Sequence, residues 1–263
     1  MTNKIFYFIL LLSLGCASSP LGRKQLILVS DDQMNSMGQL GFEEMKAKGL
    51  RSQDPKVNNF VSCVVSPITK VVGGEWEVVV FQDKSANAFA LPGGKIGVHT
   101  GILSAAKTDA QLAAVVSHEI GHVLAKHGAE RVSQTLAAQG GLGILDAVLT
   151  GKSQSSRSKS LIMAGIGLGV QYGVILPHGR TQETEADVIG LDLMSQAGFD
   201  PAQSVELWKN MQSLGGGQPP EWLSTHPSNE SRISNLQAKI PEYLPKYQKA
   251  ISQGRNPKCL LFP

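Results

Sequence analysis

Apolar residues recur with different periods along this chain, and the change of period separates predicted helices from predicted strands. From Thr108 to Leu124 the apolar positions return every three or four residues, which predicts a long helix with one buried face. Thr108 and Gln111 have the spacing of a capping box, so this helix is expected to begin just after Thr108. Its apolar positions are Leu112, Val115, Val116, Ile120, Val123 and Leu124.

Shorter segments before this helix have the composition of strands. Residues Glu75–Phe81 alternate in polarity and are rich in β-branched side chains, which predicts a strand. Asn87–Leu91 and Lys95–Val98 flank Pro92-Gly93-Gly94, a sequence that predicts strand, turn and strand. One more short strand is expected at Gln25–Val29. A small β-sheet is therefore expected to precede the helix of residues 108–124.

Helices are expected over most of the remaining chain, with boundaries at caps, glycines and prolines. These boundary residues predict a helix from Ser30 toward Lys48 and another that opens at Pro55. A third helix contains Glu183 and ends at Gly198, and a fourth starts at Asp200-Pro201. The last one starts at Ser228 and is stopped by Pro241. Residues 140–169 are glycine-rich and are expected to form a mobile excursion. The apolar run 161–176 predicts a buried helix, with a membrane span as the alternative.

The composition is that of one folded domain. The chain has 263 residues, of which 42% are hydrophobic and 17% charged, so it can bury a core and shows no bias toward disorder. The net charge of +3 is small, and no basic cluster with interleaved aromatic residues occurs, so we expect no nucleic-acid partner. Residues 22–250 are expected to form a single domain, and residues 251–263 a C-terminal tail.

The first sixteen residues have the pattern of an export signal. Lys4 precedes Ile5–Leu14, ten apolar or small residues that match the core of a signal peptide and are too few to span a bilayer. Gly15-Cys16 resembles the end of a lipobox, and lipidation of Cys16 would anchor the protein to a membrane. The alternative is ordinary signal-peptide cleavage after Ala17. The expected location is the periplasm, with the protein anchored to the outer membrane as a lipoprotein.

Two further cysteines remain if Cys16 carries lipid. Cys63 and Cys259 form an even pair, and an oxidising compartment would allow a disulfide between them. Such a bridge would tie the C-terminal tail to the helix that begins at Pro55. The alternative is two separate buried thiols, since the sequence gives no distance between the two residues.

The helix of residues 108–124 carries the candidate chemistry. His118 and His122 are four residues apart, so they project from one helix face and can bind one metal ion. Glu119 lies beside them and can take a proton from a metal-bound water. Glu183 supplies a carboxylate as third ligand and leaves the fourth tetrahedral position open for water. These residues predict one catalytic Zn²⁺, and Asp187, one turn after Glu183, is expected to accept the other ring N–H of a ligand histidine.

Four motifs in this order resemble peptidase family M48 over residues 22–244, and most of all its soluble lipoprotein members. The motifs are Asn87–Gly94, His118–His122, Glu183–Asp187, and Ser224-Thr225-His226-Pro227 with Arg232. The resemblance implies a gluzincin-type metallopeptidase fold of the α+β class, mainly α, with a small β-sheet beside the helix that holds the two histidines. It also implies that an edge strand formed by Lys95, Ile96, Gly97 and Val98 binds an extended substrate by backbone pairing.

The other histidines and two arginines carry weaker signals. The resemblance implies a site role for His226, either as a reversible extra zinc ligand or as a group that stabilises the oxyanion. His127 lies five residues after His122 and therefore off the expected zinc face, so we expect it to be structural, like His99 and His178. For Arg180 and Arg232 the default expectation is a solvated arginine, and the alternative is a side chain that steadies Glu183, Asp187 or the substrate carbonyl.

The predicted function is that of a zinc-dependent endopeptidase of the bacterial cell envelope. Its substrates would be polypeptides, namely misfolded or envelope proteins hydrolysed in quality control. One alternative is a chaperone-like assembly factor with a largely closed zinc site and envelope assembly machinery as its partner. Another is a zinc hydrolase of small amides, which would need a deep closed pocket in place of a groove beside a strand.

Overall fold

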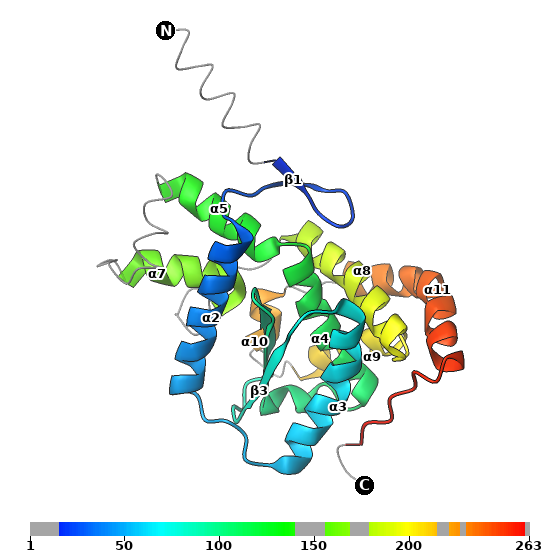
Figure 1. The fold of residues 1–263 in the computed structure, drawn as a ribbon. Helices are drawn as coiled ribbons and strands as arrows, with labels where there is room; N and C mark the ends of the chain where they lie inside the picture. The colour runs from blue at the N-terminus through cyan, green and yellow to red at the C-terminus, as the bar shows by residue number, and fades with distance from the viewer. Residues whose placement is uncertain (1–15, 140–155, 169–178, 215–220, 227–229, 261–263) are drawn as a thin grey trace, which may run out of the picture.

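The computed structural model describes residues 16–139, 156–168, 179–214, 221–226 and 230–260. Helices predominate in this part of the chain, and Figure 1 shows them arranged around a small sheet. The strands are β1 (Cys16–Ser18), β2 (Lys24–Leu26), β3 (Glu77–Phe81), β4 (Ala88–Leu91) and β5 (Lys95–His99). The fold is thus α+β and mainly α, which confirms the predicted class.

The predicted helices occur in the expected order, together with helices over residues 127–139 and 221–225 that the sequence pattern did not predict. They are α2 (Asp31–Lys48), α3 (Pro55–Val72), α4 (Asp109–Leu124), α5 (His127–Gln139), α7 (Ser156–Met163), α8 (Arg180–Ala197), α9 (Gln203–Ser213), α10 (Glu221–Thr225) and α11 (Glu230–Ser252). A short 3₁₀ helix covers Thr100–Ser104, and a π-helical turn covers Ala164–Leu168. None of the helices described combines the length and the apolar character that crossing a membrane requires.

Local capping explains why two of these helices begin where they do. Ser30 Oγ accepts a hydrogen bond from the backbone N–H of Gln33 at 3.2 Å, and Gln33 Oε1 accepts one from the Ser30 N–H at 2.9 Å. The two bonds form a reciprocal capping box at the predicted start of α2. At α4, Thr108 Oγ1 accepts from the Gln111 N–H at 3.2 Å. The start of the helix that carries the two histidines is therefore fixed by its own sequence.

The three-stranded sheet has the order β3-β5-β4. β4 and β5 form the predicted antiparallel hairpin, and β3 pairs with β5 in parallel, with Glu77 opposite Lys95. β5 is therefore the central strand, and the prediction that Lys95–Val98 forms an edge strand is wrong. Both backbone edges of β5 already pair with neighbouring strands, so this segment has no free edge for a substrate.

Both faces of this sheet are buried. Alternate residues divide between two apolar clusters: Val80, Ala90 and Ile96 pack with α3, α4 and α8, whereas Val79, Phe81 and Phe89 pack with α2, α5 and α7. Because successive side chains of a strand point to opposite faces, β3 and β4 contribute to both clusters. The sheet thus separates two helical layers, and α4 contacts β4 from one side.

The last helix extends further than predicted. Pro241 and Pro245 both lie inside α11, which continues to Ser252, so the prediction that Pro241 stops the helix is wrong. Both prolines are on the exposed side, whereas Tyr243 and Ala250 are buried against the core. Proline removes a helical hydrogen bond, but packing of the opposite face holds this helix together. The start predicted at Asp200-Pro201 is a turn instead, and α9 begins at Gln203.

Other expected elements lie partly outside the described residues. Of the glycine-rich excursion, only residues 156–168 are described, as α7 and the π-helical turn. The apolar run 161–176 is described up to Leu168, and most of its side chains there are buried. The linker predicted at residues 215–220, and His178, lie outside the described residues.

The C-terminal tail is joined covalently to α3. Cys63 and Cys259 form a disulfide with their Cα atoms 5.7 Å apart, across a sequence separation of 196 residues. The Cys259 N–H also donates to Asp109 Oδ2 at 3.1 Å, at the first residue of α4. The tail is therefore tied to two helices, one of which carries the candidate site.

Candidate metal centre

Close packing of α4 against α8 brings together residues that are about sixty positions apart. A Cβ atom on Gly121 would lie 2.8 Å from the backbone oxygen of Ala186, and one on Gly190 would lie 3.1 Å from the nitrogen of His118. Any larger residue at these two positions would push the helices apart. Glycines at these crossing points thus let Glu183 reach the histidines of α4.

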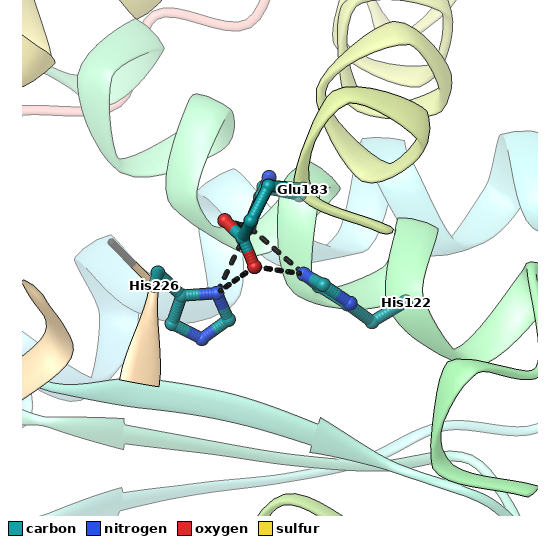
Figure 2. Close-up of side chains that lie close together, drawn as sticks. His122, Glu183 and His226 are labelled. Carbon is teal, nitrogen blue, oxygen red and sulfur yellow. Dashed lines mark hydrogen bonds and ion pairs between the residues drawn. The ribbon is translucent and has the colours of Figure 1, made fainter. Parts of the chain in front are cut away.

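Four side-chain ligand atoms meet in one buried cluster formed by His118, His122, Glu183 and His226. Figure 2 shows Glu183 between His122 and His226. The Nε2 atoms of His118 and His122 are 3.0 Å apart, and Glu183 Oε1 lies 3.4 Å from His122 Nε2. His226 Nδ1 lies 3.1 Å from Glu183 Oε1 and 3.2 Å from His118 Nε2.

These separations fit one tetrahedral metal ion. Zinc–nitrogen and zinc–oxygen bonds of about 2.0–2.1 Å place tetrahedral ligand atoms about 3.3–3.4 Å from one another. The four separations given above, 3.0–3.4 Å, are close to that value. Imidazole nitrogen and carboxylate oxygen are also the donors that suit zinc. The residues present therefore fit a single metal ion of this kind.

A second layer of charged groups orients two of these ligands. Asp187 Oδ1 lies 2.9 Å from His118 Nδ1, on the side of the ring away from the cluster. The Arg232 guanidinium donates from Nε and Nη2 to the two Asp187 oxygens, both at 2.7 Å, and forms an ion pair with Glu183. It also stacks 3.9 Å above the Trp208 ring. Arg232 is buried, so the expectation of a solvated arginine is wrong.

Burial and charge set the protonation of the cluster. Burial, together with the charges of His118 and His226, outweighs the contact with Glu183 and holds the pKa of His122 well below its usual range, which keeps a lone pair for a metal. Burial would raise the pKa of Glu183, but the charges of His226 and Arg232 hold it well below its usual value. Burial also lowers the pKa of His118, yet hydrogen bonds to Asp187 and Glu183 outweigh this and raise it to about 9. A metal ion binding there must displace that proton.

Glu119 and His226 face a cavity beside the metal cluster. Glu119 Oε1 lies 3.4 Å from His226 Nε2, so these two side chains stand together at the cluster. A cavity of about 310 Å³ is lined by Glu119, His122 and His226. Asn87 and residues 88–90 of β4 also line it. Residues 95–98 do not line it, which agrees with the central place of β5 in the sheet. The strand beside the cluster is β4.

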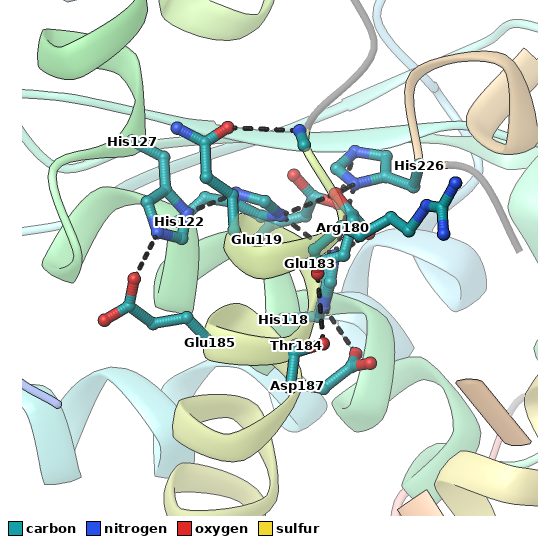
Figure 3. Close-up of polar contacts among 12 residues, drawn as sticks. His118, Glu119, His122, His127, Arg180, Glu183, Thr184, Glu185, Asp187 and His226 are labelled. Carbon is teal, nitrogen blue, oxygen red and sulfur yellow. Dashed lines mark hydrogen bonds and ion pairs between the residues drawn. The ribbon is translucent and has the colours of Figure 1, made fainter. Parts of the chain in front are cut away.

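His127 is a site residue that sequence reasoning missed. Its Nδ1 lies 2.8 Å from Nδ1 of His122, although it is five residues away. The expectation assumed one continuous helix, but α4 ends at Leu124 and Lys126 has a φ of 55°, in the left-handed region. The chain turns there and starts α5 at His127, which returns the ring to His122. Figure 3 shows the two rings together.

Three other residues considered in the sequence analysis are separate from the cluster. His99 lies on β5, where its Nδ1 is 2.8 Å from Ser85 Oγ and its ring packs edge-on against Phe81 and Phe89. Arg180 is exposed at the first turn of α8. Cys16 lies in β1, paired opposite Leu26. Of the weak candidates, the structure therefore brings His226, Arg232 and His127 to the cluster.

A helix bearing two histidines and a glutamate, a carboxylate from a second helix and an adjoining strand together define a metallopeptidase-type catalytic domain. Residues 52–240 match the family model described as Peptidase family M48. The chain belongs to peptidase family M48, which confirms the resemblance at the level of the family.

Three relatives illustrate the similarity. The chain is 37% identical over 229 residues to the mitochondrial metalloendopeptidase OMA1 of Schizosaccharomyces pombe, covering 84% of this chain and 65% of the relative. It is 32% identical over 238 residues to the human metalloendopeptidase OMA1, covering 85% and 45%. It is 28% identical over 224 residues to the beta-barrel assembly-enhancing protease of Yersinia pestis, covering 82% and 46%.

These relatives qualify the resemblance in two ways. The chain matches between about half and two thirds of the length of each, so they contain sequence that this comparison does not reach. Identity is also higher to the two mitochondrial relatives than to the bacterial protease. The expectation that bacterial lipoprotein members are the most similar is therefore not supported.

Proposed function

We propose that this protein is a zinc-dependent endopeptidase that cleaves polypeptides in an extended conformation. The observation that carries the proposal is the buried cluster of His118, His122 and Glu183 with Glu119 beside it, at a cavity bordered by β4. Zinc held there would lower the pKa of a water molecule and polarise the substrate carbonyl. Glu119 would take the proton from that water and deliver it to the leaving amine.

The proposed substrate-binding element is β4 in place of β5. β4 pairs with β5 along one edge and is one of the two outer strands of the described sheet. An extended peptide can add to such an edge through backbone hydrogen bonds, which select an unfolded conformation more than a particular sequence. Residues 87–90 also line the cavity with Glu119. A peptide on this edge would therefore present its carbonyl groups to the cluster.

The direct test is hydrolysis of a reduced, unfolded protein by the purified chain. New amino termini should appear with zinc present, disappear after chelation and return when zinc is restored. The same protein in its folded state should be resistant, because a folded substrate has no free extended segment for β4. A zinc-loaded chain that leaves several unfolded proteins intact over hours would contradict the proposal, and the chaperone-like alternative would then be favoured.

The position of His226 favours a resting state in which the zinc site is closed. Its Nδ1 lies within 3.2 Å of both His118 Nε2 and Glu183 Oε1, in the place that a fourth ligand would take. We expect His226→Ala to open this position, so that hydrolysis of a short unstructured peptide increases while zinc content stays at one per chain. Both quantities can be measured on one purified sample.

The opposite result would assign His226 a different role. If His226 stabilises the oxyanion, the same substitution should lower the rate by ~10²-fold or more, as removing an oxyanion donor does in other enzymes. An unchanged rate would remove His226 from the reaction altogether. Gln212→Ala, an exposed change on α9 at a residue that does not line the cavity, is the control and should leave the rate as it is.

We further propose that the protein works in a bacterial cell envelope, as a lipoprotein anchored through Cys16, in the quality control of misfolded or envelope proteins. The leader-like run 5–14 supports export. A disulfide between Cys63 and Cys259 suits an oxidising compartment. If the protein is instead a chaperone-like assembly factor, its partner would be the assembly machinery of the envelope, in place of polypeptide substrates.

Removal of the acyl chains should release the protein from the membrane. We expect Cys16→Ala to move the protein from the membrane pellet to the soluble fraction, because covalent lipid would be its anchor. Ala17→Ser keeps the cysteine and should remain in the pellet. Fractionation in high salt, followed by immunoblotting, measures the distribution. A Cys16→Ala protein that still sediments with membranes at high salt would refute anchoring through this residue.

A further inference from the structure

A buried polar network lies behind His122, on the side away from the cavity. His127 Nδ1 is 2.8 Å from His122 Nδ1, and His127 Nε2 is 3.0 Å from Glu185 Oε2. Figure 3 shows His127 between the His122 ring and the Glu185 carboxylate. The side chain of His127 is fully buried, and Glu185 is 5% exposed. No step of the proposed hydrolysis uses either residue.

We propose that His127 is a positioning residue that holds the zinc ligand His122, and that Glu185 and the N-terminal residues Ser19 and Arg23 hold His127 in turn. This inference rests on the proposed zinc function. It adds a structural link between the first described residues of the chain and the metal centre, through four side chains in series.

The direction of each proton in the network follows from the metal site. Zinc binding uses the lone pair of His122 Nε2, which places the ring hydrogen of His122 on Nδ1. Nδ1 of His127 lies 2.8 Å away as an acceptor for that hydrogen, and in this role it must carry a lone pair. The His127 hydrogen is then on Nε2, where it donates to the Glu185 carboxylate. One tautomer of each ring satisfies these two contacts, so the network fixes the form of His122 that binds zinc.

Residues of the N-terminal segment complete the network. Glu185 accepts hydrogen bonds from Ser19 Oγ and from Arg23 Nε, the latter at 2.9 Å. The other two nitrogens of Arg23 donate to the two Glu130 oxygens at 2.8 Å each. Glu130 also accepts from Gln182 Nε2 at 2.7 Å. Arg23 thus bridges two carboxylates, one from α5 and one from α8, and fixes the orientation of Glu185.

A role confined to core packing does not account for these contacts. A fully buried imidazole costs free energy unless both nitrogens are hydrogen-bonded, and an apolar residue would fill the same volume without that requirement. His99 provides the comparison within the same chain. It is buried to a similar extent, but its Nδ1 lies 2.8 Å from Ser85 Oγ, its ring packs edge-on against two phenylalanine rings, and it does not belong to the metal cluster.

The test measures zinc affinity directly, by competition with a chromogenic chelator. His127→Leu should weaken zinc binding by ~10–100-fold, the usual effect of removing the hydrogen-bond partner of a ligand histidine. His127→Asn should recover most of the affinity, because its amide oxygen can take the place of Nδ1 as acceptor. His99→Leu, the buried control, should bind zinc as tightly as the wild type even if it unfolds at a lower temperature.

Thermal unfolding with and without zinc separates positioning from a purely structural role. If His127 positions His122, His127→Leu should reduce the rise in Tm that zinc produces, whereas a structural role would lower both Tm values equally. Wild-type zinc affinity in His127→Leu would overturn the inference and leave the proposed function intact. Failure of the wild type itself to bind zinc would instead overturn the proposed function.

The N-terminal part of the network has its own test. The double substitution Ser19→Ala with Arg23→Gln removes both donors to Glu185 from the N-terminal segment, and it should weaken zinc binding in the same direction as His127→Leu. Lys24→Gln, a neighbouring change that leaves those donors in place, is the control. Unchanged zinc affinity in the double variant would exclude the N-terminal segment from the positioning of His122.

Discussion

Glu119→Gln should lower kcat/KM for an unfolded polypeptide by ~10²-fold or more, the scale expected for loss of a general base. Glutamine has the shape of glutamate but cannot take a proton from water. Glu119 is not one of the four residues of the metal cluster, so zinc content and Tm should match those of the wild type. The experiment combines steady-state kinetics with elemental analysis of the same preparation.

The interpretation of that variant depends on two further observations. Glu206→Gln makes the same chemical change at an exposed surface pair with Lys209 and should leave kcat/KM unchanged. The inactive variant should still bind the unfolded polypeptide, because β4 and the zinc site are intact, and it can therefore retain uncleaved substrates in cells. Turnover of Glu119→Gln near the wild-type rate would exclude Glu119 as the base.

Glu183→Ala should lose both zinc and hydrolysis. The carboxylate is the ligand contributed by α8, and its loss leaves the two histidines of α4 as the permanent ligands, because His226 is the group expected to leave the site when it opens. Three protein ligands are the usual minimum for a catalytic zinc site. The variant should contain well under one zinc per chain after dialysis, and its Tm should no longer rise when zinc is added.

A neighbouring residue provides the control for this loss. Thr184 lies on the same turn of α8 but is exposed, and its hydroxyl donates to the Arg180 carbonyl at 3.0 Å, within the helix. Thr184→Ala should keep zinc and activity. If Glu183→Ala retains a full equivalent of zinc, the third ligand lies elsewhere, and His226 becomes the first candidate.

Some features of the site were predictable because they depend on one helix alone. Residues four apart on a helix lie on the same face, so His118 and His122 had to point in one direction wherever α4 packs. The same rule links Glu183 to Asp187. Capping by Thr108 depends only on residues of the first turn. These features needed no knowledge of what surrounds each helix.

Other features depended on contacts between distant elements. The hairpin of β4 and β5 is local and was predicted, but the parallel pairing of β3 with β5 is not local and makes β5 the central strand. The prediction that Lys95–Val98 forms an edge strand was therefore wrong. Similarly, α11 passes through Pro241 because its buried face packs on α8 and α9, which outweighs the loss of one helical hydrogen bond.

The sequence by itself determined the class of this protein, the helix with its two histidines and Glu119, and the carboxylate pair of Glu183 and Asp187, because helical periodicity encodes which side chains share a face. Only the tertiary structure decided the order of the sheet, the burial of Arg232 between two carboxylates, and the return of His127 to His122. Each of these depends on how separate elements pack or on a single left-handed residue at Lys126. Neither appears in the periodicity of one segment.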